Sequence, residues 1–391
     1  MRLYDSRRRR IEPFSSPDGR VRMYVCGITP YDTTHLGHAF TYLVFDVLGR
    51  QLRWRGEALT YVQNVTDIDD DMLNRARRDG RDWRELAREN VAIFRADLVA
   101  LNAIPPTFYP FASEEVGPMR EIIGRLLESG HAYRSGGNVY FRVSRFRGYG
   151  ELSGFGRDEM LKLSAERGAD PSDPRKEDPL DFILWQASLS DEPCWETPWG
   201  PGRPGWHIEC SAMCHHYLGE QLEIHGGGAD LIYPHHESEI AQSESFTGRR
   251  PFARFWVHTG MVRYQGEKMS KSLGNMVFVR DLRRRYSADA IRLCLLGHHY
   301  RESFDFEEAE LRPAQELADA LAAAVSEPGD GSDGAAGQSL AAGLAALDDD
   351  LNTPGAIAAL RTLLERAPSE DRRRALAALG DALGLTFKPR R

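Results

Sequence analysis

The sequence predicts an α/β fold, a parallel sheet that carries an insertion and is followed by a helical C-terminal domain. The first observation is a strand-like run, Arg22–Cys26, that leads through the turn Gly27–Pro30 into helical periodicity from Gly37 to Arg53. The second is another strand-like run after that helix, Ala58–Gln63. Strands that alternate with helices favour a parallel sheet with helices on both faces.

The next elements continue this pattern and then interrupt it. Helical patterns run from Trp83 to Leu101 and from Ser113 to Ser129. A glycine- and charge-rich stretch, Phe146–Asp181, follows and predicts an insertion between two halves of the sheet domain. The strand pattern resumes at Gln221–His225 and Phe255–Arg263.

The last part of the chain is predicted to be helical. Glu327–Gly337 is low in apolar residues and rich in glycine, which is typical of a flexible linker. Leu340–Leu385 is rich in alanine and leucine at helical spacing, which predicts two or three short packed helices. The expected segments are a first half of the sheet domain with a helical part (1–145), an insertion (146–200), a second half (201–275), a helical region (276–326), a linker (327–338) and a short helical domain (339–391).

Composition indicates a globular enzyme. The 391 residues are 41% hydrophobic and 28% charged, with a formal net charge of −8 that gives no general attraction to nucleic acid. No apolar stretch approaches a membrane span, and the N-terminus lacks the apolar core of a signal peptide. Five scattered cysteines do not form a disulfide framework. We expect a cytoplasmic protein with no membrane partner, acting as a monomer.

Two short strings predict phosphate handling. His35-Leu36-Gly37-His38 places two imidazoles around a glycine at an expected helix start, where free N–H groups favour a triphosphate. Lys268-Met269-Ser270-Lys271-Ser272 is a lysine-rich loop that can stabilise charge on a reacting phosphate. An accidental histidine pair and a solvated basic loop are the alternative. The order of the strings, with the first one after an apolar strand, favours the functional interpretation.

Several residues are suited to a tetrahedral zinc site. Cys26 ends the first strand, Cys210 lies in a Trp-His-Ile-Glu-Cys run, and His235, His236, Glu237 and Glu239 form a dense cluster. They are far apart in sequence, so spacing alone leaves open the alternative that the cysteines are small buried residues.

Longer segments resemble the cysteinyl-tRNA synthetase superfamily of class I synthetases over nearly the whole chain. They are Met23–Gly27, Val62–Asp67, Arg203–Cys210, Gly226–Leu231, Pro234–Glu237 and Gly266–Asn275. The resemblance implies a Rossmann-like class I synthetase sheet domain and zinc ligands at Cys26, Cys210, His235 and Glu239. His236 and Glu237 then become neighbours of the metal ligands.

The resemblance also implies roles for the other candidate residues. The sulfur of L-cysteine is expected on zinc, its α-amino group near Thr29 or Thr66, and Trp206 as a pocket wall, with an ordinary core aromatic as the alternative for Trp206. ATP with Mg²⁺ is expected over His35 and His38, approached by Lys268 and Lys271. The remaining expected ATP- and cysteine-binding residues are Gly27, Thr41, Asn64, Gly228, Asp230 and Val262.

The acceptor of the activated cysteine divides the superfamily into two branches. The run Cys26–Ala39, the segment Glu166–Pro171 and the short tail after Asp348–Pro354 are closest to the mycothiol cysteine ligase branch, whose acceptor is glucosaminyl-inositol. Glu239 and His225 match the synthetase branch instead. We predict the ligase; the alternative is a cysteinyl-tRNA synthetase that lacks a full anticodon-binding domain. A non-catalytic nucleotide-binding relic is opposed by the presence of both phosphate motifs.

Overall fold

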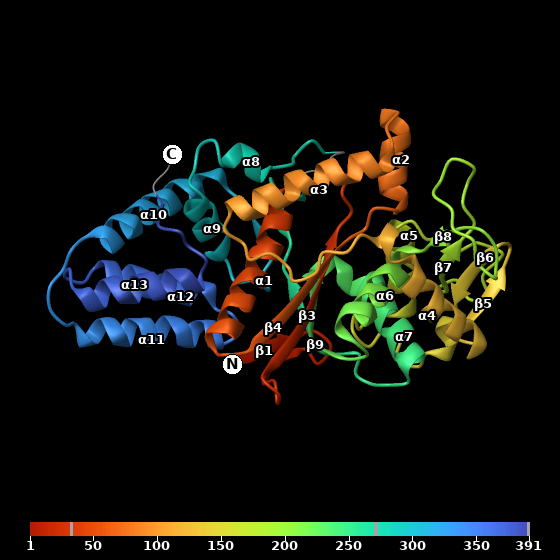
Figure 1. The fold of residues 1–391 in the computed structure, drawn as a ribbon, viewed down its shortest axis with the longest axis horizontal. Helices are drawn as coiled ribbons and strands as arrows, with labels where there is room; N and C mark the ends of the chain where they lie inside the picture. The colour runs from red at the N-terminus through yellow and green to blue at the C-terminus, as the bar shows by residue number, and fades with distance from the viewer. Residues whose placement is uncertain (32–33, 270–272, 389–391) are drawn as a thin grey trace.

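A four-stranded parallel sheet forms the centre of the molecule (Figure 1). The computed structural model describes residues 1–31, 34–269 and 273–388. The strands are β3 (Arg20–Ile28), β4 (Ala58–Val65), β9 (Leu222–Gly228) and β10 (Ala253–Thr259), in the order β10-β9-β3-β4. All three pairings are parallel, which confirms the predicted α/β fold.

Side-chain alternation along β3 supplies both faces of this sheet. Met23 and Val25 belong to one hydrophobic core, with helix α1 (Leu36–Trp54). Tyr24 and Cys26 belong to the other, with helix α6 (Trp206–Leu218). Because successive strand residues point to opposite faces, the sheet is covered on both sides, as predicted.

Helix α1 begins where the sequence predicts within one residue. His35 is its N-cap, and its Nδ1 accepts a hydrogen bond from the Gly37 N–H over 3.0 Å. This contact satisfies one of the free N–H groups of the first turn.

An antiparallel sheet joins the predicted insertion to residues on either side of it. It consists of β5 (Ala132–Ser135), β6 (Asn138–Phe141), β7 (Phe182–Gln186) and β8 (Arg203–Pro204). The hairpin between β5 and β6 turns at Gly136 and Gly137, which have positive φ; no element was predicted from the sequence in this region.

Other helices surround the central and insertion sheets. They are α2 (Asp70–Asp79), α3 (Trp83–Ala100), α4 (Val116–Glu128), α5 (Arg157–Glu166) and α7 (Glu237–Thr247), with short 3-10 turns such as Ala112–Glu114 between them. The predicted helices at Trp83–Leu101 and Ser113–Ser129 correspond to α3 and α4.

Beyond the central sheet the chain is mainly helical. The strand run predicted at Phe255–Arg263 is broken at Gly260, where a side chain would meet the Glu302 carbonyl oxygen at 2.2 Å. After this break, β11 (Val262–Tyr264) forms a small sheet with β12 (Glu267–Lys268) and β13 (Phe304–Asp305). The helices that follow are α8 (Val279–Leu282), α9 (Ala288–Leu296), α10 (Leu311–Ser326), α11 (Gly334–Asp348), α12 (Thr353–Leu364) and α13 (Glu370–Ala382).

Helix α11 starts inside the segment expected to be a linker. Asp333 caps it by accepting from the Ala335 N–H, and it pairs with Arg366 of the following helical region. The capping aspartate and the alanines after it explain why the extended part ends at residue 333.

Two polar networks attach the helical region to the sheet domain. The buried Arg292 guanidinium pairs with Asp46 of α1 and donates to the Leu101 and Leu383 carbonyls. The N-terminal strand β1 (Arg2–Asp5) pairs with β2 (Arg10–Pro13). Asp350 accepts hydrogen bonds from the Tyr4 N–H of β1 and from the Tyr300 hydroxyl.

In Figure 1 the helical region and the insertion lie at opposite ends of the molecule. Within the described ranges, each helix is too short or too polar to cross a membrane.

Candidate active site

A cavity of about 910 Å³ opens at the carboxyl ends of β3, β4 and β9. Strand β3 is followed by β4 on one side and pairs with β9 on the other, so the chain direction across the sheet reverses here. Ligands of open parallel sheets bind at such a switch point.

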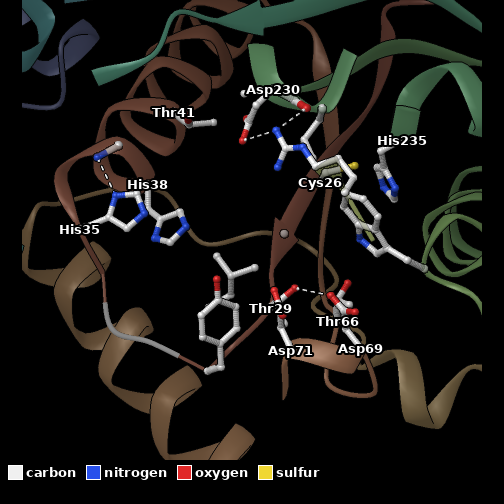
Figure 2. A pocket seen from close by; sticks show the side chains of 18 of the residues that line it. Cys26, Thr29, His35, His38, Thr41, Thr66, Asp69, Asp71, Asp230 and His235 are labelled. Carbon is white, nitrogen blue, oxygen red and sulfur yellow. Dashed lines mark hydrogen bonds and ion pairs between the residues drawn. The ribbon is translucent and has the colours of Figure 1, made fainter. Parts of the chain in front are cut away.

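The structure brings nearly all the candidate residues to this cavity (Figure 2). Two are exceptions: Glu239 is fully buried behind the wall, and Lys271 lies outside the described residues. The candidates that line the cavity are Cys26, Gly27, Thr29, His35, His38, Thr41, Asn64, Thr66, Trp206, Cys210, Gly228, Asp230, His235, Val262 and Lys268.

Four donors converge at one end, which we call the metal end: Cys26, Cys210, His235 and Glu239. Their ligand atoms all lie within 4.8 Å of one another. The two sulfurs are 3.8 Å apart, and Glu239 Oε1 is 3.5 Å from Cys26 Sγ and 3.2 Å from His235 Nε2. Two thiols, an imidazole and a carboxylate at this spacing fit a tetrahedral zinc ion.

Burial sets the protonation of this end. It raises the pKa of the Cys26 thiol well above its ordinary value and raises that of Cys210. It lowers the pKa of His235, which holds that imidazole neutral. Buried thiols become thiolates when a cation replaces their protons, so the donor set is matched to a divalent metal.

A second set of donors overlaps the first and was not singled out from the sequence. The ligand atoms of Cys26, His225, His236 and Glu239 also lie within 4.8 Å of one another. His225 Nε2 lies 2.9 Å from Glu239 Oε2, and His236 Nε2 lies 3.2 Å from Cys26 Sγ. Cys26 is distant in sequence, and His225 lies on β9 whereas His236 and Glu239 lie at the start of α7, so spacing alone did not indicate that these four donors meet.

The neighbours of the metal end hold it in place. His236 Nδ1 is 2.7 Å from His258 Nε2, and Trp206 stacks on the His235 ring at 4.4 Å, so Trp206 is a wall of the cavity. Outer partners such as His258 and Trp206 orient metal ligands. Glu237 points away from this end: it accepts a hydrogen bond from the Ser153 N–H and so links the insertion to α7.

The junction between β3 and β4 requires glycine at residue 27. A side chain there would meet the Asn64 carbonyl oxygen at 1.5 Å. The Gly27 N–H donates to Asn64 Oδ1 over 2.7 Å, and Asn64 Nδ2 donates to Thr66 Oγ1 over 3.1 Å. This chain of hydrogen bonds fixes the Thr66 hydroxyl at the cavity wall beside the metal end.

The opposite end, which we call the nucleotide end, contains His35, His38, Asp230 and Lys268. The two imidazoles stack at 3.8 Å, and Lys268 Nζ lies 3.1 Å from Asp230 Oδ2. Burial lowers the pKa of His38 to about 4 and that of His35 well below its ordinary value, so both rings are neutral at pH 7. Because His35 Nδ1 accepts from Gly37, its proton is on Nε2 and can be donated to a ligand.

An acidic wall of the cavity was also missed. Asp69, Asp70 and Asp71 stand at the start of α2, four to six residues after the end of β4, and line the cavity with Glu166. Asp69 accepts from the Thr29 hydroxyl over 3.3 Å, and burial together with Asp71 and Asp70 raises its pKa to about 6. Three consecutive aspartates shortly after a predicted strand were the available signal.

Comparisons with known proteins define the class of this chain. The fold matches that of a class I synthetase: the structure of Mycobacterium tuberculosis methionyl-tRNA synthetase in complex with methionyl-adenylate aligns with a TM-score of 0.66, at 17% identity, over 93% of this chain and 89% of that one. The family model for the class I (C) tRNA synthetase catalytic domain matches residues 14–316. The chain belongs to this family and is an enzyme of the ligase type.

Two relatives carry different names. A Thermobispora bispora protein named L-cysteine:1D-myo-inositol 2-amino-2-deoxy-alpha-D-glucopyranoside ligase is 48% identical over 92% of this chain and 88% of its own length. A Dehalococcoides mccartyi protein named cysteine--tRNA ligase is 47% identical over 82% of this chain and 69% of its own length. Both names contain cysteine, and they differ in the acceptor.

Proposed function

We propose that this enzyme activates L-cysteine with ATP and transfers the cysteinyl group to the amine of glucosaminyl-inositol. The observation that carries this proposal is one cavity with two chemically different ends, a Cys/Cys/His/Glu metal end and a His/His/Lys nucleotide end. The relatives named above support cysteine as the amino acid.

Cys26, Cys210, His235 and Glu239 are the residues that would hold zinc. Zinc is thiophilic, so the bound ion would supply selective contact with the sulfur of cysteine and reject the hydroxyl of serine. Trp206 would close the side of this pocket, and the hydroxyl of Thr29 or Thr66, both on the cavity wall, would bind the α-amino group of the substrate.

Activation joins the cysteine carboxylate to the α-phosphorus of ATP. A carboxylate oxygen attacks that phosphorus, the bond to the bridging oxygen breaks, and pyrophosphate leaves. A Mg²⁺ ion bound with ATP would neutralise part of the phosphate charge. His35 and His38 at the start of α1, with Lys268, would donate to the phosphate oxygens on which charge develops. Gly228, Asp230 and Val262 line the part of the cavity suited to the adenosine.

Transfer of the cysteinyl group then takes place at the carbonyl carbon of the activated cysteine. The acceptor nitrogen attacks it as the free amine, AMP leaves, and the nitrogen loses one proton as the amide forms. Asp69, Asp71 and Glu166 give the wall beside this position a negative charge, which attracts an aminosugar and offers acceptors to its hydroxyls. The cytoplasm, where ATP is available, is the compartment this reaction requires.

A cysteine--tRNA ligase is the second candidate. It is favoured by Glu239, which completes a four-donor set within 4.8 Å, and by the cysteine--tRNA ligase relative. The acidic wall opposes it, because carboxylates at the acceptor position repel the phosphates of a tRNA end.

The test is AMP release from the purified enzyme with ATP and cysteine. We expect release to depend on glucosaminyl-inositol and to be unchanged by tRNA. Dependence on tRNA alone would establish the second candidate, and pyrophosphate exchange without cysteine dependence would exclude both. Serine in place of cysteine is the control for selectivity.

A further inference from the structure

An arginine from the insertion reaches the nucleotide end of the cavity. Arg167 follows the last residue of α5 and lines the cavity. Its Nη2 lies 3.3 Å from the Asp230 carbonyl oxygen and 3.5 Å from Asp230 Oδ2. No residue of the central sheet domain supplies this guanidinium, so the insertion adds a charge to a site built elsewhere.

Arg167 shares its carboxylate partner with a lysine. Lys268 Nζ is 3.1 Å from the same Asp230 Oδ2. Lys268 and Arg167 together hold the pKa of Asp230 below its ordinary value although burial acts in the opposite direction. Within the described ranges this is the only ion pair of Arg167, so two cations face one anion at the nucleotide end.

The pairing of two cations with one carboxylate points to an anionic ligand at this end of the cavity. We propose that Arg167 is a substrate-binding residue that leaves Asp230 and binds the phosphates of ATP. A triphosphate carries more negative charge than one carboxylate, and its oxygens match the guanidinium fork in bidentate geometry. Departure of Arg167 and Lys268 frees the Asp230 oxygens to accept from the ribose hydroxyls.

The charge of Arg167 also favours a phosphate over the amine acceptor as its ligand. An amine acceptor arrives at this cavity as a cation or as a neutral polar group, and a guanidinium repels the first and gains less from the second than from a phosphate. The inference rests on the proposed use of ATP but not on the identity of the acceptor.

The experiment compares three variants by their affinity for a non-hydrolysable ATP analogue with Mg²⁺. Calorimetry measures this affinity in the absence of cysteine and acceptor. Arg167→Met removes the charge, and Arg167→Lys keeps it without the fork. Arg157→Met is the matched control on the same helix, since Arg157 is exposed and pairs with Asp178 over 2.8 Å. We expect a loss of about 10- to 100-fold for Arg167→Met, as for one lost charge-assisted contact, partial recovery for Arg167→Lys, and no change for Arg157→Met.

Steady-state kinetics separate a binding role from a structural one. In cysteine-dependent pyrophosphate exchange, Arg167→Met is expected to raise the KM for ATP with the KM for cysteine and the melting temperature unchanged. Unchanged analogue binding in a folded Arg167→Met protein overturns the inference, as does a rise confined to the KM of the acceptor. Failure of the proposed function is a different result, in which the unmutated enzyme binds the ATP analogue but transfers no cysteine.

Discussion

The two ends of the cavity differ in how far they are formed before substrates arrive. At the metal end the four donors are at most 4% exposed and contact one another. At the nucleotide end Lys268 is 54% exposed and is paired with Asp230, a partner that ATP must displace. In the proposed function, amino-acid selection is therefore assigned to donors in the core, whereas phosphate binding is assigned to groups that would exchange partners.

The largest effect is expected at the nucleotide end. His38→Ala removes a neutral ring from the first turn of α1, and we expect cysteine-dependent pyrophosphate exchange to fall about 100- to 1,000-fold, as for other lost transition-state donors. Cysteine binding measured by calorimetry should change little because the metal end is separate. Equal losses in both measurements would show that the two ends are not independent.

The next effect tests the metal end. Cys210→Ser should lower zinc affinity by at least about 100-fold, beyond what loss of an outer partner costs, and should relax discrimination against serine. Elemental analysis after dialysis and exchange assays with serine measure both. Cys214→Ser, one helical turn away and also buried, is the control. Full zinc content in the Cys210 variant would contradict the assignment.

A smaller effect distinguishes the two overlapping donor sets. If His236 only orients the centre, His236→Asn should reduce zinc affinity about tenfold. The spectrum of the cobalt-substituted protein should keep the intensity of two thiolates. A loss as large as that of Cys210→Ser would instead make His236 a direct ligand. His216→Asn, on the last turn of α6, is the control.

The smallest effect is a pH dependence of the acidic wall. Asp69 titrates near pH 6, so above this pH its charge attracts an amine acceptor and below it that attraction is lost. The KM for the aminosugar should rise a few-fold between pH 7 and pH 5. Asp69→Asn should show a high KM with a weaker pH dependence, and Asp79→Asn, at the exposed end of α2, should resemble the unmutated enzyme.

The raised pKa of Asp69 also affects the stability of the folded protein. The pKa of Asp69 is raised from 3.8 to about 6 by burial and by Asp71 and Asp70, with Glu209 of α6 also close. Its ionisation therefore disfavours the folded state, and the protonated form is favoured below pH 6. Asp69→Asn should raise the melting temperature at pH 7.5 and not at pH 4; a fall at pH 7.5 would contradict this.

Local patterns predicted the elements that position the site. The strand–turn–helix run from Arg22 to Arg53 appears as β3 and α1, because alternation and capping are encoded by neighbouring residues. The motif residues His35, His38 and Lys268 line the same cavity. The histidines follow β3 at the carboxyl edge of the parallel sheet, and Lys268 lies on the small sheet that follows β10.

Convergence of distant residues was not predictable in the same way. His225 and His236 join the metal end through side-chain directions on β9 and before α7, which no spacing rule specifies. Arg167 reaches Asp230 only because the insertion folds back over the cavity. The hairpin that turns at Gly136 and Gly137 was not predicted, because a short hairpin has a weaker periodic signal than a helix.

The contact between Tyr4 and Asp350 constrains how the protein is made. The two residues are separated by 346 positions. At the usual pace of synthesis of about 5–20 residues per second, Asp350 follows Tyr4 out of the ribosome by roughly 20 to 70 seconds. The central sheet, whose strands end by Thr259, can assemble before that. Closure of the first strand by the helical region is therefore a late event, during which a chaperone has access to the edge of β1.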